Sequence, residues 1–138
     1  MSINVLIVPA GSGMAIVAIK ALKQDKKITL VSLDSDFLAP GLYLSHKRYL
    51  IPRFEDPNFL TELITIARRE NIHFIYPCLD PLLEILCENR EKIEDKTGAE
   101  IIMSPAESIK LCRDKWNLYT FLNGKVNMPL TLLFEHAN

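Results

Sequence analysis

The chain has 138 residues, of which 49% are hydrophobic and 24% are charged, and its formal net charge is -1. A chain of this length lies in the single-domain range and should bury roughly two thirds of the surface that it exposes when unfolded. The 16 basic residues nearly balance the 17 acidic ones, so no overall field attracts a polyanion. Nucleic acid and anionic membranes are therefore excluded as default partners.

The amino terminus and the apolar runs argue against export and membrane insertion. Met1-Ser2-Ile3-Asn4 has no cationic leader, and charged residues interrupt every apolar run well before it could span a bilayer. We therefore expect a soluble, cytoplasmic protein with no membrane contact.

The three cysteines, Cys78, Cys87 and Cys112, are odd in number and have no C-x-x-C spacing. This pattern argues against both a disulfide framework and a zinc site. Cys78 lies two residues before Asp80, but no histidine is placed in the sequence to activate it. We interpret it as a small core residue and not as a nucleophile.

Apolar strands and helical patterns alternate from the amino terminus. Val5–Val8 is a continuous apolar run, typical of a parallel strand that is covered on both faces. The short loop Pro9–Gly13 follows it, and apolar residues then recur at helical spacing at Ala15, Ile16, Ile19 and Leu22. Thr29–Leu33 is the next strand, which ends at Asp34. The pattern predicts a complete βαβ unit.

Three later helices are expected to begin where an oxygen-bearing side chain precedes proline. Such a residue can cap free backbone N–H groups, and proline at the first helical position loses no needed donor. The pairs are Asp56-Pro57, Asp80-Pro81 and Ser104-Pro105, and Ser104 with Glu107 also fits a capping box. Short apolar strands lie between them at residues 74–76 and 101–103, and another precedes the first pair at residues 49–51. The alternation predicts an α/β fold with a doubly wound parallel sheet.

Two charged or irregular segments have less definite interpretations. Residues 38–53 form a long connection after an acidic strand end, where α/β proteins place ligand-contacting loops. This connection is either a basic lip over a site or a solvated loop with Tyr43 and Leu44 packed inward. Residues 88–96 are dense in alternating charges and are interpreted as an exposed helix end.

The first loop contains the clearest candidate binding residues. Gly11 and Gly13 permit close backbone approach and direct amide N–H groups, aided by the helix N-terminus, at a phosphate or carboxylate, and Ser12 adds a hydroxyl. The signal is weak, because a G-x-G-x-x-G motif requires glycine at position 16, which is Ile16.

Two acids and one lysine follow as further candidates. Asp34 lies 21 residues after Gly13, so it could hold a ribose, a substrate hydroxyl or an amine, or it could bond the backbone of Asp36 in a turn. Asp80 is expected to cap a helix, with or without a ligand contact. Lys115 opens a helix over residues 115–122 that Asn123-Gly124 ends, and composition alone makes it a surface lysine.

Several landmarks, in this order, give the chain a family likeness. They are Asp34-Ser35-Asp36, the segment from Ala39 to Lys47, the segment from Pro77 to Glu84, Asp114-Lys115, and Met128-Pro129-Leu130-Thr131. In this order the chain resembles the start of ATP-grasp proteins, and most closely the branch that resembles the carbamoyl-phosphate synthase large subunit.

The resemblance implies a Rossmann-like pre-ATP-grasp domain over residues 1–113 and the beginning of a truncated ATP-grasp domain over residues 114–138. In such ligases ATP phosphorylates a carboxylate, and an amine or another nucleophile attacks the acyl phosphate. The resemblance implies substrate-binding roles for the residues of the acceptor cleft, Gly11, Ser12, Gly13, Asp34 and Asp80. It also implies a contact between Lys115 and an ATP phosphate.

The family's glycine-rich phosphate loop and its magnesium ligands would lie downstream of Thr131. We therefore expect ATP and Mg²⁺ as cofactors of the full-length protein, none bound tightly by this fragment, no metal site or catalytic residue here, and no ligase activity by the fragment alone. The expected partner is a small-molecule carboxylate or amine. The apolar tail, Trp116 to Asn138, is expected either to dock back on the chain's own sheet or to contribute to a homodimer contact.

Two other functions stay open from the sequence. One is a stand-alone nucleotide- or NAD-binding module, which the glycine loop and Asp34 favour and Ile16 disfavours. The other is a non-catalytic domain that pairs with another chain.

Overall fold

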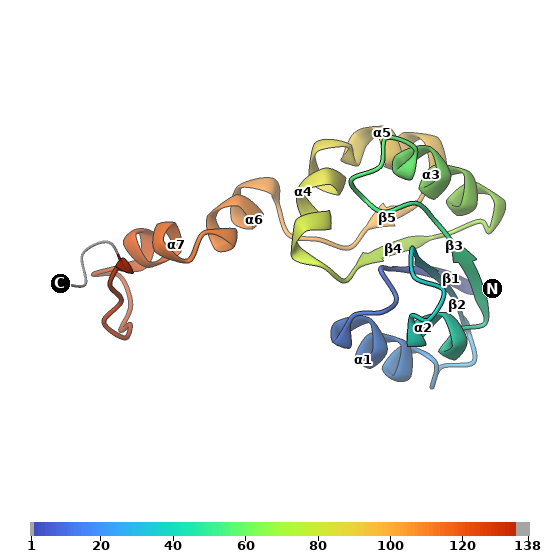
Figure 1. Cartoon of the computed structure of the whole chain (residues 1–138), viewed down its shortest axis with the longest axis horizontal. Helices are drawn as coiled ribbons and strands as arrows, with labels where there is room; N and C mark the ends of the chain where they lie inside the picture. The colour runs from blue at the N-terminus through green and yellow to red at the C-terminus, as the bar shows by residue number, and fades with distance from the viewer. Residues whose placement is uncertain (1, 135–138) are drawn as a thin grey trace. The chain divides into compact units, whose positions relative to one another are not determined.

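The computed structural model of the chain describes residues 2–134 (Figure 1). The chain forms two compact units, Met1–Met103 and Ser104–Asn138, and each is described by itself. This division falls before the one expected after Arg113, because the helix that contains Arg113 belongs with the helix that follows it.

The first unit is built on a five-stranded parallel sheet, with the strand order β3-β2-β1-β4-β5. Every pairing in it is parallel, as the alternating sequence pattern predicts. The strands are β1 (Ile3–Val8), β2 (Ile28–Asp34), β3 (Lys47–Leu50), β4 (Phe74–Pro77) and β5 (Glu100–Ile101). The α/β, doubly wound class is thereby confirmed.

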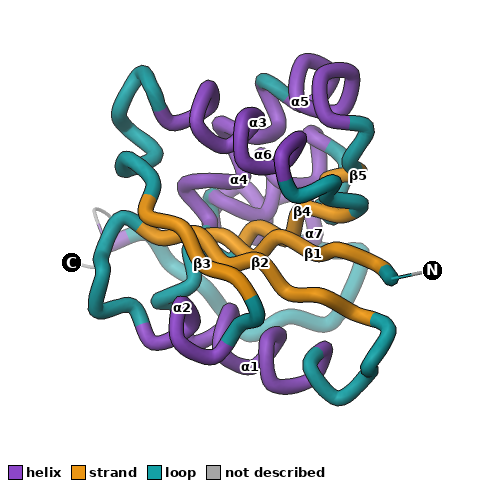
Figure 2. Tube along the Cα trace, turned by 90° about the vertical axis from the view of Figure 1, so that its right-hand side faces the viewer, coloured by secondary structure: helices purple, strands orange, loops and turns teal. Residues whose placement is uncertain are grey.

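Helices cover both faces of this sheet. Figure 2 shows α1 and α2 on one face and α3, α4 and α5 on the other. Their bounds are α1 (Gly13–Leu22), α2 (Pro40–Leu44), α3 (Phe59–Arg69), α4 (Asp80–Glu88) and α5 (Arg90–Thr97).

The central strand β1 divides its side chains between the two layers. Leu6 and Val8 belong to the larger hydrophobic cluster, which includes residues of α3, α4 and α5. Val5 and Ile7 belong to the smaller cluster with Ile19 of α1. Successive side chains of a strand point to opposite faces, so a continuous apolar run is what a strand between two helical layers requires.

The expected helix caps are wrong in all three places. The N-cap of α3 is Asn58, and Asp56 instead accepts the N–H of Asn58 at 2.8 Å in the preceding turn. Asp80 is the first residue of α4, whose N-cap is Leu79 and has no side-chain cap bond. Helix α6 (Ala106–Arg113) follows Pro105 without a capping side chain. The proline does mark the first turn of α4, but the capping position lies one residue earlier than expected.

The connection after β2 is more ordered than its sequence indicates. It contains α2 and then β3, which forms the edge of the sheet. Tyr43 is exposed and does not pack inward; its hydroxyl donates to the carbonyl of Phe37 at 2.7 Å. Residues 88–96 are likewise not a simple exposed helix end, because α5 is a separate helix and Ile93 is fully buried.

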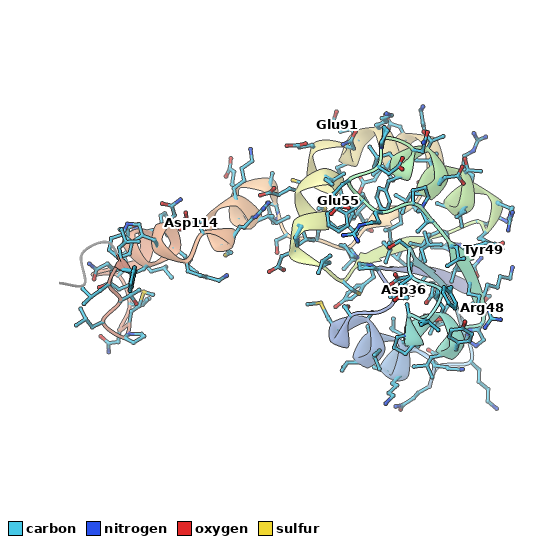
Figure 3. All side chains as sticks on the ribbon, viewed as in Figure 1. Asp36, Arg48, Tyr49, Glu55, Glu91 and Asp114 are labelled. Atoms are coloured by element: carbon cyan, nitrogen blue, oxygen red, sulfur yellow. The ribbon has the colours of Figure 1, made fainter. Side chains whose placement is uncertain are left out.

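The second unit contains α6 and α7 (Lys115–Leu122). Asp114, labelled in Figure 3, caps α7 by accepting the N–H groups of Trp116 and Asn117 at 2.8 and 2.9 Å. The predicted start and end of this helix are confirmed. Across residues 2–134, no helix has both the length and the apolar character needed to cross a bilayer.

Candidate functional site

The strand order makes the connections after two neighbouring central strands diverge at the carboxyl ends of the strands. From β1 the chain first builds outward through β2 to β3, and later returns to place β4 on the other side of β1. The connections that leave the carboxyl ends of β1 and β4 therefore diverge, and open α/β sheets bind ligands at such a point. Residues 9–12 and residues 78–79 are the two connections at this position.

Asp34, at the end of β2, is hydrogen-bonded to the first of these connections. Its Oδ2 accepts the backbone N–H of Gly11 at 2.7 Å, and its Oδ1 accepts the N–H of Asp36 at 2.9 Å. Only 6% of the residue is exposed. The bond to Asp36 is the one that the turn interpretation of the sequence predicts, whereas the bond to Gly11 was not expected.

Ser12 and Gly13 form the start of α1. The Ser12 hydroxyl accepts the N–H of Ala15 at 3.0 Å and so caps the helix. Gly13 is exposed, and a Cβ at this position would meet no atom within 4 Å. The loop thus presents the positive end of a helix dipole at the carboxyl edge of the sheet, as the sequence predicts.

Gly41 is a functional candidate that sequence reasoning missed. A Cβ on Gly41 would overlap the carbonyl oxygen of Ala10 and would lie 2.9 Å from Cδ1 of Ile19. The absence of a side chain lets α2 rest against the loop that precedes α1. The sequence Ala39-Pro40-Gly41 indicates a turn, but it does not show which distant backbone the glycine approaches.

The sequence also predicts Asp80 and Lys115 as site residues. Asp80 is exposed at the start of α4, which follows β4 at the same edge of the sheet. Lys115 lies in the second unit, where its Nζ donates to the carbonyl of Cys112 at 2.7 Å. The structure brings together Gly11, Ser12, Gly13 and Asp34, and it leaves the roles of Asp80 and Lys115 as predictions.

A small cavity lies beside Asp34. It measures about 20 Å³, roughly the space of one water molecule, and Asp34, Ile51, Arg53 and Leu82 are among its lining residues. A larger hollow of about 380 Å³ lies beside Arg90, Glu94 and Gly98, before β5 begins, and therefore away from the carboxyl ends of the strands. We favour the end of the sheet that holds Asp34 as the candidate binding site, although its cavity is smaller, because the start of α1 and the diverging connections lie there.

A cluster of charged and polar side chains lies at the amino ends of the strands, opposite the end that holds Asp34. Glu70 follows α3 and is 7% exposed; Lys47 donates to its carboxylate at 2.5 Å, and the Tyr49 hydroxyl also donates to it. These donors, Lys47 first, hold the pKa of Glu70 below its usual value. Figure 3 shows Tyr49 on the edge strand β3. The cluster ties β3 to α3 and is structural.

Cys78 is the cysteine that directly follows β4, at the carboxyl end of that strand. Cys78 is buried after β4, and desolvation raises the pKa of its thiol to about 11. A thiol of this kind is a poor nucleophile. Among residues 2–134, no group of three or more histidine, cysteine or acidic side chains is arranged to hold a metal ion.

Several solved structures have the same fold. The biotin carboxylase subunit of a pyruvate carboxylase superposes with a TM-score of 0.59 and 23% identity over 88% of this chain and 27% of its own. N5-carboxyaminoimidazole synthetase from Staphylococcus aureus, solved with ADP, gives a TM-score of 0.58 and 17% identity over 88% of this chain and 30% of its own. Glycinamide-RNase-transformylase T from Mycobacterium tuberculosis gives a TM-score of 0.59 and 13% identity over 91% of this chain and 36% of its own. The fold is that of the pre-ATP-grasp domains with which such enzymes begin.

The particular family follows from a sequence match. Residues 5–102 match the family model described as the PylC-like, N-terminal domain. This match covers most of the chain, and the chain belongs to that family. The chain spans about a third or less of the length of the first solved structures that it resembles.

A search of curated proteins gives no significant sequence match. The comparisons support an N-terminal domain of the ATP-grasp type. They do not single out carbamoyl-phosphate synthase, which the sequence landmarks indicate.

Proposed function

We propose that this chain is the substrate-side N-terminal domain of an ATP-dependent carboxylate ligase that works through an acyl phosphate. The observation that carries the proposal is the family match over residues 5–102. That range includes Gly11, Ser12, Gly13, Asp34 and Asp80, which lie at the carboxyl ends of β1, β2 and β4 or at the starts of the helices that follow β1 and β4. The order of the sequence landmarks supports, within this proposal, a relation to the carbamoyl-phosphate synthase large subunit.

The geometry favours binding of an acidic substrate by this domain over a catalytic step carried out in it. The amino end of α1 favours a negatively charged group, because its first N–H groups and its dipole face the edge of the sheet. The buried Asp34 carboxylate holds the loop and leaves little surface for proton transfer. We therefore propose that this domain binds and orients a small carboxylate or amine, and that ATP and Mg²⁺ are bound by a part of the protein that corresponds to the rest of its longer relatives.

In this proposal Lys115 contacts an ATP phosphate in the complete enzyme. The residue is exposed, and its ammonium group donates to a single backbone carbonyl, so it has donors left for a phosphate oxygen. Lysine acts on phosphates as a mobile point charge, a role that needs no fixed side-chain geometry.

Titration of residues 1–138, followed by amide chemical shifts, tests the proposal. The ligands are magnesium-ATP, NAD and a panel of free amino acids. We expect at least one amino acid to shift the amides of residues 11–13 and no saturable response to magnesium-ATP below millimolar concentration, since the proposal assigns ATP to a part of the protein that corresponds to the rest of its longer relatives. Micromolar affinity for ATP or NAD would instead support a stand-alone nucleotide-binding module. No response to any amino acid would contradict the substrate-side function.

A further inference from the structure

Two loops that border the site are joined to each other by one carboxylate. Residues 9–12 connect β1 to α1, and residues 35–39 connect β2 to α2. Asp34 accepts the N–H of Gly11 from the first loop and the N–H of Asp36 from the second, at 2.7 and 2.9 Å. Hydrogen bonds to a charged acceptor are stronger than neutral ones, so the two loops share a substantial link.

Packing reinforces this link. Ala10 of the first loop and Ala39 of the second are buried together with Leu42 of α2. A Cβ on Gly11 would lie 3.3 Å from the Cβ of Ala39. A Cβ on Gly41 would overlap the carbonyl oxygen of Ala10, so the two backbones are in close contact. The loops therefore contact each other through backbone and small side chains, with few rotatable groups between them.

We propose that Asp34 is a positioning residue, which holds the two loops as one rigid body and presets the backbone of residues 11–13 for a ligand without itself contacting substrate. Both carboxylate oxygens accept loop N–H groups, and 6% exposure leaves little of the residue for a ligand. A loop that is already ordered binds without the entropy cost of ordering. The ligand part of this inference rests on the proposed function, whereas the coupling of the loops does not.

Amide hydrogen exchange of the 138-residue chain tests the coupling directly. In Asp34→Ala both the Gly11 and the Asp36 amides should exchange at least tenfold faster than in the wild type. In Asp34→Asn one of the two should stay slow, because the side-chain amide has one acceptor oxygen and its NH₂ group cannot accept. Asp34→Asn keeps the test readable if the alanine variant does not fold. Unchanged exchange of Gly11 and Asp36 in a folded variant would overturn the coupling.

Asp25→Asn is the matched control. Asp25 accepts the N–H of Lys27 at 2.8 Å in a turn before β2, and thus makes the same kind of bond at the other end of that strand. Its substitution should leave the exchange of Gly11 and Asp36 unchanged. A faster exchange of these two amides in this variant would show a general loss of stability and would contradict a specific role for Asp34.

Binding separates a positioning role from a contact role. With the amino acid that gives the largest response in the wild type, Asp34→Asn should bind about tenfold more weakly while the same loop amides still shift. Equal affinity would overturn the positioning role. Complete loss of binding with normal exchange of Gly11 would make Asp34 a direct ligand contact and would also overturn it. If the wild type binds no amino acid, the proposed function fails, and the exchange experiment still decides the coupling.

Discussion

Gly41 lies so close to Ala10 that a side chain on Gly41 would overlap the Ala10 carbonyl oxygen. Two residues on different loops are thus related by backbone contact, and the carbonyl cannot move without displacing the loop that begins α1. This contact sets the distance of α2 from the candidate site.

Gly41→Ala should therefore destabilise the protein by about 3 kcal/mol, as expected for overpacking against a rigid neighbour. The overlap outweighs the gain of about 1 kcal/mol that alanine gives inside a helix. Chemical unfolding of the variant and the wild type measures the difference. Gly13→Ala is the control, since a Cβ there meets no atom within 4 Å, and it should be neutral or stabilising. A loss below about 1 kcal/mol for Gly41→Ala would show that α2 shifts freely.

Gly11→Ala should have an intermediate effect, a loss of about 1 kcal/mol. The new Cβ would lie 3.2 Å from Oδ2 of Asp34 and 3.3 Å from Cβ of Ala39, and neither neighbour is on a flexible side chain. The structure gives Gly11 and Gly13 no positive φ angle, so crowding is the only source of this cost. Thermal melts check the prediction, and a higher Tm than that of the wild type would contradict it.

The sequence predicts the elements of this fold better than their contacts. Apolar runs such as Val5–Val8 show the buried strands directly, and Asp114 with Asn123-Gly124 marks α7 through local capping chemistry. Asp80 shows the limit of local rules. An Asp-Pro pair has the composition of a cap, but the extended backbone of Leu79 takes that position in the structure.

The candidate site is predictable only in its strand-end residues. The glycine loop and Asp34 follow from the position of two strands along the chain. The bond between Asp34 and Gly11 joins residues 23 positions apart, and the contact of Gly41 with Ala10 depends on the path of a loop that lacks a regular pattern. Neither has a signal in a single sequence, because both result from packing between connections.

Glu70 gives a prediction for stability at low pH. The pKa of Glu70 is lowered in the folded protein from its ordinary value of 4.5. The contribution of the ionised carboxylate to the free energy of unfolding is therefore fully present above pH 4.5, and it is lost as the pH falls through the lowered pKa of the folded state. Glu70→Gln should cost about 2 kcal/mol at pH 7, because the donors Lys47 and Tyr49 lose their charged acceptor. The difference from the wild type should shrink at acid pH.

Urea unfolding between pH 3 and pH 7 measures this difference. Glu91→Gln is the control, because Glu91 is exposed on α5, and it should change stability little at any pH. A cost for Glu70→Gln that does not vary across this range would contradict the role of the charge.

Two of the cysteines, Cys78 and Cys112, should differ sharply in reactivity. Cys112 is exposed, whereas Cys78 is buried and the pKa of its thiol is raised to about 11. At pH 8 iodoacetamide should alkylate Cys112 in the native protein and Cys78 only after unfolding, since the thiolate is the reactive form. Peptide mass spectrometry at successive times assigns each modification. Rapid native alkylation of Cys78 would contradict its interpretation as a core residue.

The second unit is expected to mediate pairing of the chain. Helix α7 has no buried residue, and Leu130 and Leu132 are 82% and 66% exposed. A monomer rarely exposes apolar residues in such a cluster, so we expect the tail to form a homodimer contact; its last residues, 135–138, lie outside the described part of the chain.

Sedimentation velocity should show a concentration-dependent dimer for residues 1–138 and a monomer for residues 1–103. Leu130→Asp with Leu132→Asp in the full chain should also give a monomer, which separates loss of the apolar surface from loss of the whole unit. If the full chain is a monomer with the same Tm as residues 1–103, the tail neither pairs nor packs, and the prediction is wrong.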